Sequence, residues 1–480
     1  MTIEEAIAGP AVAGAQTALV FRGRFGPGID RWAYVPFAVP AGVRRISVWT
    51  WHERFSLFRV ARNVLDLGIF GPDGHGVGRA PGFRGWSGGA RQGFTLSAID
   101  ATPGYLAGPI EAGRWALALG PVVLNPLGMR WQARIVLEHG EPGDCLATGP
   151  APAAAAGRGT GWYRGDLHLH TVHSDGRRRP AELVAEARAA GLDFIVSTEH
   201  NTNAANRMWA AAQPDDLLVV AGEEVTTRHG HWLAVGLGPG EWVDWRYAPR
   251  DRVFGRYAEQ VRRGGGLVVV AHPAVPMPGA AWEFGYRDVD AIEVWNGVWN
   301  VDDEVSLRIW QRLLRRGRRI VAVGGSDSHA AHQRVGLPQT VVHAAALSTP
   351  ALVEALRHGR SYIAASSDVT LELTASSTTG EGTRTAGPGD TLAVPPGTPV
   401  TVTATVTGAP GTTLAIITAQ GCAARAAIGA SGAHRVRWTT TADRAGFVRI
   451  EVRRPAFGRL SAMVALSNPV WLQPLVPPAI

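Results

Sequence analysis

Residues 1 to about 150 alternate short apolar runs with turns that are rich in glycine and proline. The runs RRISVWTW (44–51), LDLGIF (65–70), RWALALG (114–120) and WQARIVLE (131–138) are typical of strands. GPDG (71–74) and AGPIEAG (107–113) are typical of the turns between them. The pattern predicts an all-β domain over 1–150, an antiparallel sandwich or a jelly-roll-like module.

The pattern changes after APAAAAGRG (151–159), a low-complexity segment that we interpret as a linker. Strand, loop and helix now follow one another, and several of the strands are continuous apolar runs, as in buried parallel sheets. The seven predicted strands are GDLHLH, DFIVSTEH, LLVVAGEEVTT, HWLAVGL, LVVVAHP, AIEVWN and IVAVGGSDSH. Helices are predicted at 180–190, 204–212, 252–263 and 302–316. The region 160–365 therefore resembles a βα barrel one unit short of eight, with its chemistry at the C-terminal strand ends.

Alternation of single apolar and polar residues returns at 368–480. VTLELTA, VTVTATV, TLAIITAQ, HRVRWTTT and FVRIEVRR are rich in threonine and valine. They predict a second all-β sandwich. This region carries no motif with evident chemistry, so we expect a structural, docking or oligomerisation role.

Composition narrows the class of protein. A chain of 480 residues with 46% hydrophobic and 18% charged residues is expected to fold into two or three globular domains. The net charge of +7 comes entirely from arginine, because the sequence has no lysine, and we attribute it to biased composition rather than to a nucleic-acid interface. Cys145 and Cys422 are too few for a disulfide framework. No signal peptide or membrane span is recognised, so we expect a soluble cytoplasmic protein with a small-molecule substrate; its oligomeric state is open.

Nine side chains of the kinds that bind metals occur in order through the central region, most of them at the ends of predicted strands. They are His168, His170, Asp175, His200, Glu224, His231, His272, Asp327 and His329. Imidazoles and carboxylates are the ligands of hard and borderline divalent cations. The series therefore predicts a cluster of such ions.

Spacing selects among neighbouring residues. His168 and His170 share one face of a strand, so both can bind one ion, and Asp327 and His329 have the same spacing. Glu224 is preferred over Glu223 as a carboxylate that bridges two ions. His231, which begins the next strand, is preferred over His229. The spare histidines, His173 and His332, are expected at the surface.

The order H-x-H, SDG, T-E-H-N, G-x-E-V-T, G-H, A-H-P and S-D-S-H resembles the PHP family, named for polymerase and histidinol phosphatase. GWYRGDLHLHTVHSDG and EVWNG…GGSDSH are similar to its CehA/McbA-like metallohydrolase branch, which includes carbaryl hydrolases. The resemblance covers about 160–365 and implies a distorted seven-stranded (β/α)7 barrel that holds up to three metals.

The resemblance also implies a ligand set for each ion. The first ion would take His168, His170, Glu224 and Asp327. The second would share Glu224 and take His231 and His272. The third would take Asp175, His200 and His329. Glu199 departs from the Asp that many relatives have before the histidine, and we expect it to orient a ligand rather than to bind metal.

The amidohydrolase barrels also open with H-x-H on their first strand. Their common binuclear site needs a carboxylated lysine as the bridge between two metals. A chain without lysine cannot provide one. Glu224 must serve as the bridge here.

These residues predict a hydrolase. The leading hypothesis is a phosphoesterase in which metal-bound hydroxide attacks the substrate in a site with two or three ions of zinc, manganese or iron. Hydrolysis of a carbamate or carboxylic ester, as in carbaryl hydrolases, is the alternative. A glycan-binding protein with a degenerate barrel is the third hypothesis.

Candidate roles are assigned to individual side chains. The expected catalytic residues are His200, His329 and Asp327. The expected substrate-binding residues are Arg228 and Arg334, which could bind a phosphate, and Trp295 with Asn296, which would suit an aryl group. His332 is a further candidate for proton transfer.

Overall fold

The structure, a computed structural model, describes most of the chain. The described residues are 2–6, 16–26, 32–54, 63–123, 128–141, 143–144, 154–155, 158–212, 215–380, 382–455 and 461–475. Most of the linker predicted at 151–159 lies outside this set, and so does Cys145.

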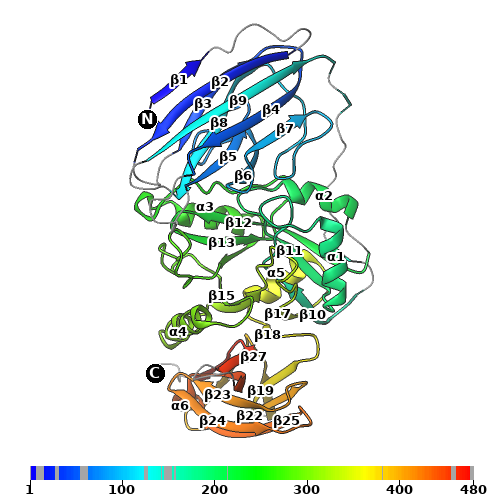
Figure 1. The fold of residues 1–480 in the computed structure, drawn as a ribbon. Coiled ribbons are helices and arrows are strands. Elements are labelled where there is room, and N and C mark those ends of the chain that lie inside the picture. Colours follow the sequence, from blue (N-terminus) through cyan, green and yellow to red (C-terminus); the bar gives the residue numbers. More distant parts are fainter. Residues whose placement is uncertain are drawn as a thin grey trace.

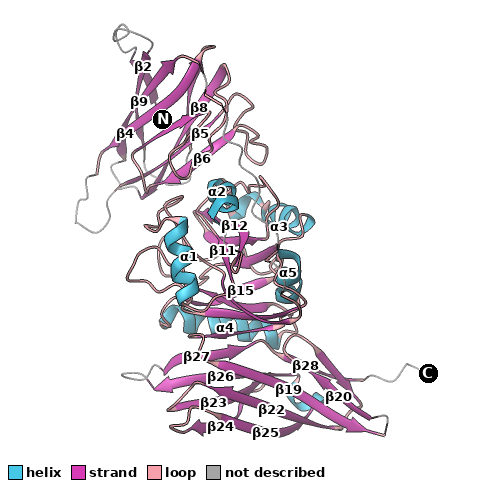
Figure 2. Cartoon of the chain, turned by 90° about the vertical axis from the view of Figure 1, so that its right-hand side faces the viewer, coloured by secondary structure: helices cyan, strands magenta, loops and turns pink. Residues whose placement is uncertain are grey.

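The chain forms three tiers in sequence order (Figure 1). β-Sheets make up the first and the third tier, and the long helices gather in the middle one (Figure 2). This succession agrees with the predicted change of pattern along the sequence. The domain boundaries near 150 and 368 stay predictions.

The first tier contains two antiparallel sheets that share one core. Their strand orders are β1-β2-β9-β4-β7 and β3-β8-β5-β6. The strands are β1 (Thr2–Ala6), β2 (Gln16–Phe25), β3 (Ala33–Val39), β4 (Val43–His52), β5 (Val64–Phe70), β6 (Phe83–Gly88), β7 (Gly93–Ser97), β8 (Gly113–Val123) and β9 (Met129–His139). Alternate residues of each strand face the shared core, for example Leu65, Leu67 and Ile69 of β5. The arrangement is the sandwich that the alternation predicts.

The middle tier contains all seven predicted strands, side by side in chain order from β10 to β16. Its strands are β10 (Gly161–Asp166), β11 (Phe194–Ser197), β12 (Leu218–Thr227), β13 (Gly230–Val235), β14 (Leu267–Val270), β15 (Ala291–Asn296), β16 (Val321–Gly325), β17 (Gln339–Ala344) and β18 (Ser361–Ala364). Its helices are α1 (Pro180–Ala189), α2 (Ala204–Ala212), α3 (Phe254–Arg263), α4 (Val301–Arg315), α5 (Thr349–Arg357) and the short 3-10 helix η1 (Pro249–Asp251). The four predicted helices correspond to α1–α4.

A (β/α)7 barrel is not shown, because strand and helix do not simply repeat. β13 is antiparallel to both β12 and β14. Only Arg228 and His229 separate β12 from β13, and two residues allow a hairpin but not a helical crossover. The two ends of the seven-stranded row nevertheless meet beyond β10 and β16, where Leu169 and Ser328 form a parallel bridge. The row of strands is therefore curved, so that the segments that follow its first and its last strand lie next to each other.

The third tier is hydrogen-bonded to the middle one. β18 pairs with β27, so Tyr362 lies opposite Ser467, and the sheet continues through β26 and β23 to β24. A second sheet has the order β20-β19-β22-β25 and packs on the same core. The elements are β19 (Thr370–Thr379), β20 (Gly382–Ala386), β21 (Thr391–Val394), β22 (Pro399–Thr407), β23 (Thr412–Thr418), β24 (Gly421–Ile428), β25 (His434–Thr441), α6 (Ala442–Ala445), β26 (Phe447–Pro455), β27 (Ser461–Ser467) and β28 (Val470–Pro474).

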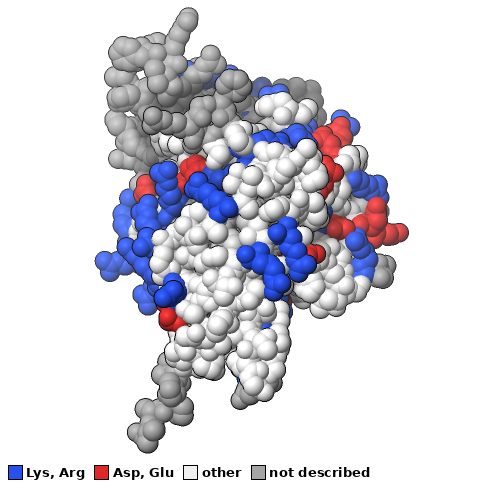
Figure 3. All heavy atoms as spheres, turned by 90° about the horizontal axis from the view of Figure 1, so that it is seen from below, with Lys and Arg blue, Asp and Glu red and all other residues white. Residues whose placement is uncertain are grey.

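The surface of the third tier shows no single charged patch in the view from below. Figure 3 shows arginine side chains dispersed in several groups among uncharged ones over this face. Within the described ranges, none of the helices has the length and apolar character that crossing a membrane would require.

The first tier is packed firmly on the middle one. Phe70 and Trp86, which point away from the sandwich core, are buried in one cluster with Trp245 of the middle tier. Arg246 adds polar links, since it donates to the Tyr34 hydroxyl over 2.6 Å and to the carbonyl of His75 over 2.9 Å. The sandwich and the metal-ligand region therefore share a core and are not joined by a linker alone.

Phe70→Ala tests this shared core. Phe70 is fully buried, so the variant should lose about 3–5 kcal/mol of unfolding free energy through lost burial and a cavity. Urea denaturation followed by tryptophan fluorescence measures the loss. Val298→Ala is the control, because Val298 is 73% exposed and its truncation should change stability by no more than about 0.5 kcal/mol. Equal effects of the two variants would contradict the packing described.

Candidate metal centre

Strand direction brings the predicted ligands to one edge of the central sheet. β10, β11, β12, β14, β15 and β16 run the same way, and β13 runs against them. The chain therefore leaves six strands and enters β13 at the same edge. The ligands follow this rule: His168 and His170 come after β10, His200 after β11, Glu224 near the end of β12, His231 at the start of β13, His272 after β14, and Asp327 and His329 after β16.

The carboxylate of Glu224 lies at the centre of the cluster. Its Oε2 is 3.3 Å from His168 Nε2, 3.4 Å from His170 Nε2 and 2.8 Å from His200 Nδ1. Its Oε1 is 3.0 Å from His231 Nδ1 and 3.2 Å from His272 Nε2. The two oxygens thus face two different sets of imidazoles, which is the geometry of a bridging carboxylate.

The deepest group of ligands has unsatisfied polar atoms. His168, His170 and Glu224 are fully buried, and Asp327 Oδ1 lies 3.4 Å from His168 Nε2 and 3.1 Å from His170 Nε2. The atoms without a hydrogen bond among the described residues include His168 Nε2, His170 Nε2, Glu224 Oε2 and Asp327 Oδ1. Buried polar atoms are rarely left so. Four converging nitrogen and oxygen atoms fit a divalent cation.

Glu293, which the sequence reasoning missed, orients His168. The Glu293 carboxylate lies 3.1 Å from His168 Nδ1 and accepts from the backbone N–H of His272 over 2.9 Å. A proton on Nδ1 leaves the Nε2 lone pair of His168 for a metal. The available signal was a charged residue within the apolar run AIEVWN of β15.

Glu199 lies behind His170, where a residue that orients this predicted ligand is expected, and its role stays a prediction. Its carboxylate accepts hydrogen bonds from Ser174 Oγ and from Thr171. Ser174 Oγ in turn lies 3.4 Å from Nδ1 of His170. This chain of contacts orients the His170 ring from behind.

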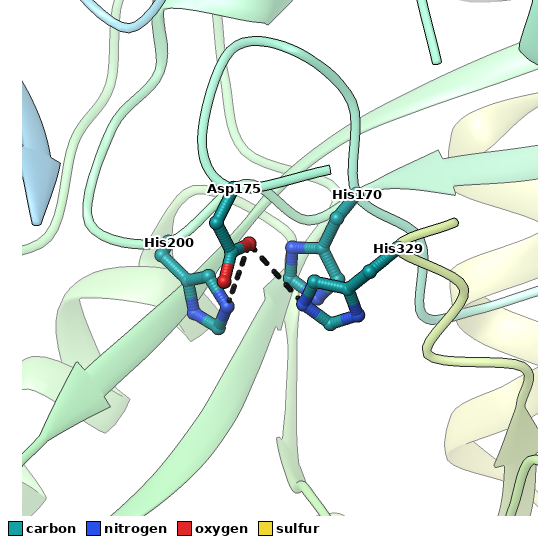
Figure 4. Close-up of side chains that lie close together, drawn as sticks. All are labelled: His170, Asp175, His200 and His329. Atoms are coloured by element: carbon teal, nitrogen blue, oxygen red, sulfur yellow. Dashed lines mark ion pairs between the residues drawn. The ribbon is translucent and has the colours of Figure 1, made fainter. Parts of the chain in front are cut away.

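In the third group the carboxylate of Asp175 contacts both His200 and His329 (Figure 4). Asp175 Oδ1 lies 3.4 Å from His200 Nε2 and 3.2 Å from His329 Nε2. The ring of His170 stacks against those of both His200 and His329, with centroid separations of 4.3 and 4.1 Å, and these two rings lie 5.8 Å from each other. The side chain of Asp175 is 45% exposed, so this group faces the outside, whereas His168, His170 and Glu224 are fully buried.

The charges of the cluster shift the pKa values of its side chains in different directions. Burial and the neighbouring His329 and His200 lower the pKa of His170 to about 3, which leaves its imidazole neutral. Burial would raise the pKa of Glu224, but His200 and His168 hold it well below its usual range. Burial alone would lower the pKa of His200, yet Glu224 and Asp175 raise it to about 10.

The backbone is strained where it carries ligands. His272 and Asp327 have φ angles of +24° and +48°, and Asn201, next to His200, has +54°. Side chains other than glycine rarely adopt this region. Such conformations persist where the surrounding structure fixes them, commonly at functional sites.

The structure distinguishes Glu224 from its neighbour Glu223, and His231 from its neighbour His229. Glu223 points away from the cluster and accepts from the backbone N–H of Val243 over 2.9 Å, and burial raises its pKa well above the usual range. His229 contacts Glu283 at 2.8 Å, whereas His231 contacts Glu224. The geometry agrees with the preference for Glu224 and His231.

Two of the four predicted substrate-binding residues lie at the cluster, and the other two do not. Arg228 lies beside the cluster, and Asn296 donates to Glu293 over 2.9 Å and towards Asp327 over 3.4 Å. Trp295 is a core residue, 1% exposed, because its indole packs inside the middle tier and donates to the carbonyl of Gly297. Arg334 is exposed and is not among the described residues that line the pocket next to the cluster.

The spare histidines also differ from each other. His332 is exposed, as expected. His173 is only 8% exposed, because the first tier covers it and the backbone N–H of Gly104 donates to its Nδ1 over 3.4 Å. The expectation that His173 lies at the surface is wrong.

A pocket of about 320 Å³ opens beside the exposed group of ligands. Asp175, His200 and His231 line one side of it. The opposite side comes from the first tier and includes Trp32 and Asp66, which the sequence reasoning did not identify. Their roles depend on packing between tiers, so no local motif marks them.

Comparisons with known proteins give weak likenesses. No family model matches the sequence, and no curated protein matches it significantly. A two-domain protein from Bacteroides vulgatus, described as containing a predicted PHP-like metal-dependent phosphoesterase, is 17% identical, with a TM-score of 0.37 over 67% of this chain and 100% of its own. An amidohydrolase from Chromobacterium violaceum is 19% identical, with a TM-score of 0.28 over 36% and 89%. A candidate metal-dependent phosphoesterase from Bifidobacterium adolescentis is 21% identical, with a TM-score of 0.28 over 39% and 92%. Because these TM-scores are below 0.5, we base the function on the geometry of the cluster, and the PHP resemblance stays a prediction.

Glu224→Gln and Glu223→Gln form a matched test of the metal centre. Glu224→Gln replaces the negative charge that faces five imidazoles with a neutral amide, so tightly bound metal should fall by at least half. Glu223→Gln should leave the metal content unchanged, because a protonated carboxyl and an amide are nearly isosteric. Elemental analysis after purification without chelator measures both. The same metal content in the two variants would contradict the central place of Glu224.

Proposed function

We propose that this chain is a metal-dependent hydrolase, and in particular a phosphoesterase, that works with two or three divalent ions. One observation carries the proposal: among the described residues, four buried ligand atoms face one another without hydrogen bonds, namely His168 Nε2, His170 Nε2, Glu224 Oε2 and Asp327 Oδ1. Side chains that merely stabilised the fold would pair these atoms. A set of nitrogen and oxygen ligands suits zinc, manganese or iron.

The contacts support three ligand groups. His168, His170, Glu224 and Asp327 would hold one ion; Glu224, His231 and His272 a second; and Asp175, His200 and His329 a third. The distances between their ligand atoms are short enough for shared ions in the groups His168–His170–Asp327, His168–Glu224–His272 and His170–Asp175–His200–His329. The exposed third group is the one that solvent and substrate reach most easily.

Bound divalent ions would supply a nucleophilic water at neutral pH and neutralise charge that develops on the substrate. The chain supplies the remaining parts. Glu293 and Ser174 fix the rings of His168 and His170, and Asn296 restrains the carboxylate of Asp327. Full burial of His168, His170 and Glu224 keeps bulk water away from the deepest ligands.

His200 and His329 are the groups best placed to move a proton. They flank Asp175 on the open side of the cluster, and His200 Nδ1 also lies 2.6 Å from Thr226 Oγ1. When the third group holds no ion, either imidazole can donate a proton to the leaving group. His332 is exposed and shows no contact with the ligands among the described residues, so we do not assign it this role.

The phosphoesterase assignment is supported by a cation next to the cluster. Arg228 lies in the hairpin turn between Glu224 and His231 and lines the pocket. A guanidinium can bind two oxygens of a phosphate group and balance part of its negative charge. The runner-up is hydrolysis of a carbamate or carboxylic ester, which the largely apolar pocket favours. Both hypotheses use the same cluster.

A substrate panel tests the reaction class. Purified protein with its metals should hydrolyse p-nitrophenyl phosphate, and a higher kcat/KM for 1-naphthyl acetate or a 1-naphthyl carbamate would favour the alternative. His231→Gln should lower kcat/KM by about 100-fold, as loss of a ligand or its support commonly does. His229→Gln is the control and should keep the wild-type rate, because that ring contacts Glu283 and not Glu224.

Two results would overturn the proposal. Metal content near zero with no turnover of any ester would leave a binding protein with a degenerate centre, such as a glycan-binding one. Turnover that survives in His231→Gln at the His229→Gln level would place the reaction elsewhere.

A further inference from the structure

The outer face of one first-tier sheet is built to cover the metal centre. In β5 the residues Asp66, Gly68 and Phe70 alternate with those of the sandwich core and point at the middle tier. Ala118 and Gly120 of β8 lie beside them, with Gly120 directly opposite Asp66 in the ladder. Alternate residues of β5 therefore pack into the sandwich core on one face and against the middle tier on the other.

Small residues on this face make room for large ones from elsewhere. A Cβ at Gly120 would lie 2.4 Å from the ring of Trp32 and 2.5 Å from Nη2 of Arg228, which neither group could accept without moving. A Cβ at Gly68 would lie 2.2 Å from the ring of Trp86. The two glycines therefore let both indoles and the guanidinium approach the sheet closely.

One wall of the pocket is formed by Trp32, Trp86, Asp66 and Arg228. Residues of the first and of the middle tier hold this wall in place. The ring of Trp32 lies 5.4 Å from that of Trp86 and 6.1 Å from that of Trp245, centroid to centroid. The guanidinium of Arg228 lies 4.1 Å above Trp32 and 4.0 Å from Asp66 Oδ2. Burial raises the pKa of Asp66 to about 7 against the opposing effects of Arg228 and His200.

The first tier also fixes the loop that carries Asp175. Arg91 donates to the carbonyl of Val172 over 2.6 Å, and the Thr202 hydroxyl donates to the carbonyl of Gly104 over 2.9 Å. These bonds join the sandwich to the segments on either side of the third ligand group. These hydrogen bonds therefore fix the position of the first tier relative to Asp175 and His200.

The cavity between wall and cluster has the size and lining for an organic group. Its volume of about 320 Å³ lies at the lower end of the range for small-molecule pockets. Apart from Asp66 and Arg228, its far side is formed by apolar or small residues: Trp32, Trp86, Ala90, Val122, Met277 and Ala280. A bare phosphate held at the metals would leave this space unfilled.

We propose that the N-terminal sandwich completes the substrate pocket and selects substrates in which a flat, apolar, ring-sized group adjoins the ester that is cleaved. Trp32 is the specificity-determining residue, since its indole lines the pocket, while the ester lies towards Asp175, His200 and His231. This inference rests on the proposed hydrolase function for the position of the ester. The binding of the apolar group does not depend on turnover.

The kinetic test compares benzyl phosphate with ethyl phosphate, whose leaving alcohols have similar basicity, by release of inorganic phosphate. The wild-type protein should favour benzyl phosphate by about tenfold or more in kcat/KM. Trp32→Ala should lower this ratio about tenfold. Trp49→Ala is the matched control on the opposite sheet of the sandwich, where Trp49 is 52% exposed, and it should keep the wild-type ratio. If carboxylic esters prove to be the substrates, benzyl and ethyl acetate replace the phosphates.

A binding test separates failure of this inference from failure of the proposed function. Titration calorimetry with 2-naphthol, which needs no turnover, should show binding that is weakened about tenfold in Ala90→Trp, where an added indole fills the pocket from an exposed position. Ala427→Trp, at an exposed site of β24, is the control and should bind like the wild type.

The outcomes are distinct. Hydrolysis of both phosphates with equal kcat/KM, or a ratio that Trp32→Ala does not change, would overturn the inference while the proposed function stands. Binding of 2-naphthol that Ala90→Trp does not weaken, or no binding at all, would also overturn it. Absence of hydrolysis with pocket-dependent 2-naphthol binding would overturn the proposed function and retain the pocket.

Discussion

The sealed carboxylate of Glu224 is the constraint on which the centre depends. It lies within 3.4 Å of five imidazole nitrogens and is excluded from solvent. A buried anion surrounded by imidazoles is costly unless cations or protons balance it. Supporting groups such as Glu293 behind His168 leave the imidazole lone pairs for a cation that would lie next to this carboxylate. Under the proposed function, metal binding and folding are therefore coupled at Glu224.

The sheet geometry explains why these residues meet. Six parallel strands deliver side chains to their C-terminal edge, and the reversed β13 delivers His231 from its N-terminal end to the same edge. The N-terminal sandwich then closes the open side with Trp32 and Asp66. Chemistry is supplied by the middle tier, whereas the shape of the pocket is shared between two tiers.

Features that leave a pattern in a short stretch of sequence could be predicted from the sequence alone. Strand-end ligands such as His168 and Glu224 could be assigned because periodicity shows which residues share a face. The antiparallel β13 was missed although only Arg228 and His229 separate it from β12, which is too short for a crossover. The burial of Trp295 and the pocket wall at Trp32 could not be predicted, because each depends on contacts between segments far apart in the chain.

Anomalous diffraction from crystals of the protein purified with its metals tests the central claim most directly. The account predicts peaks at a metal absorption edge on both sides of the Glu224 carboxylate, one within bonding distance of His168 Nε2 and Asp327, the other of His231 and His272. Glu224 carboxylate oxygens hydrogen-bonded only to protonated histidines, with no peak between them in metal-replete crystals, would contradict it.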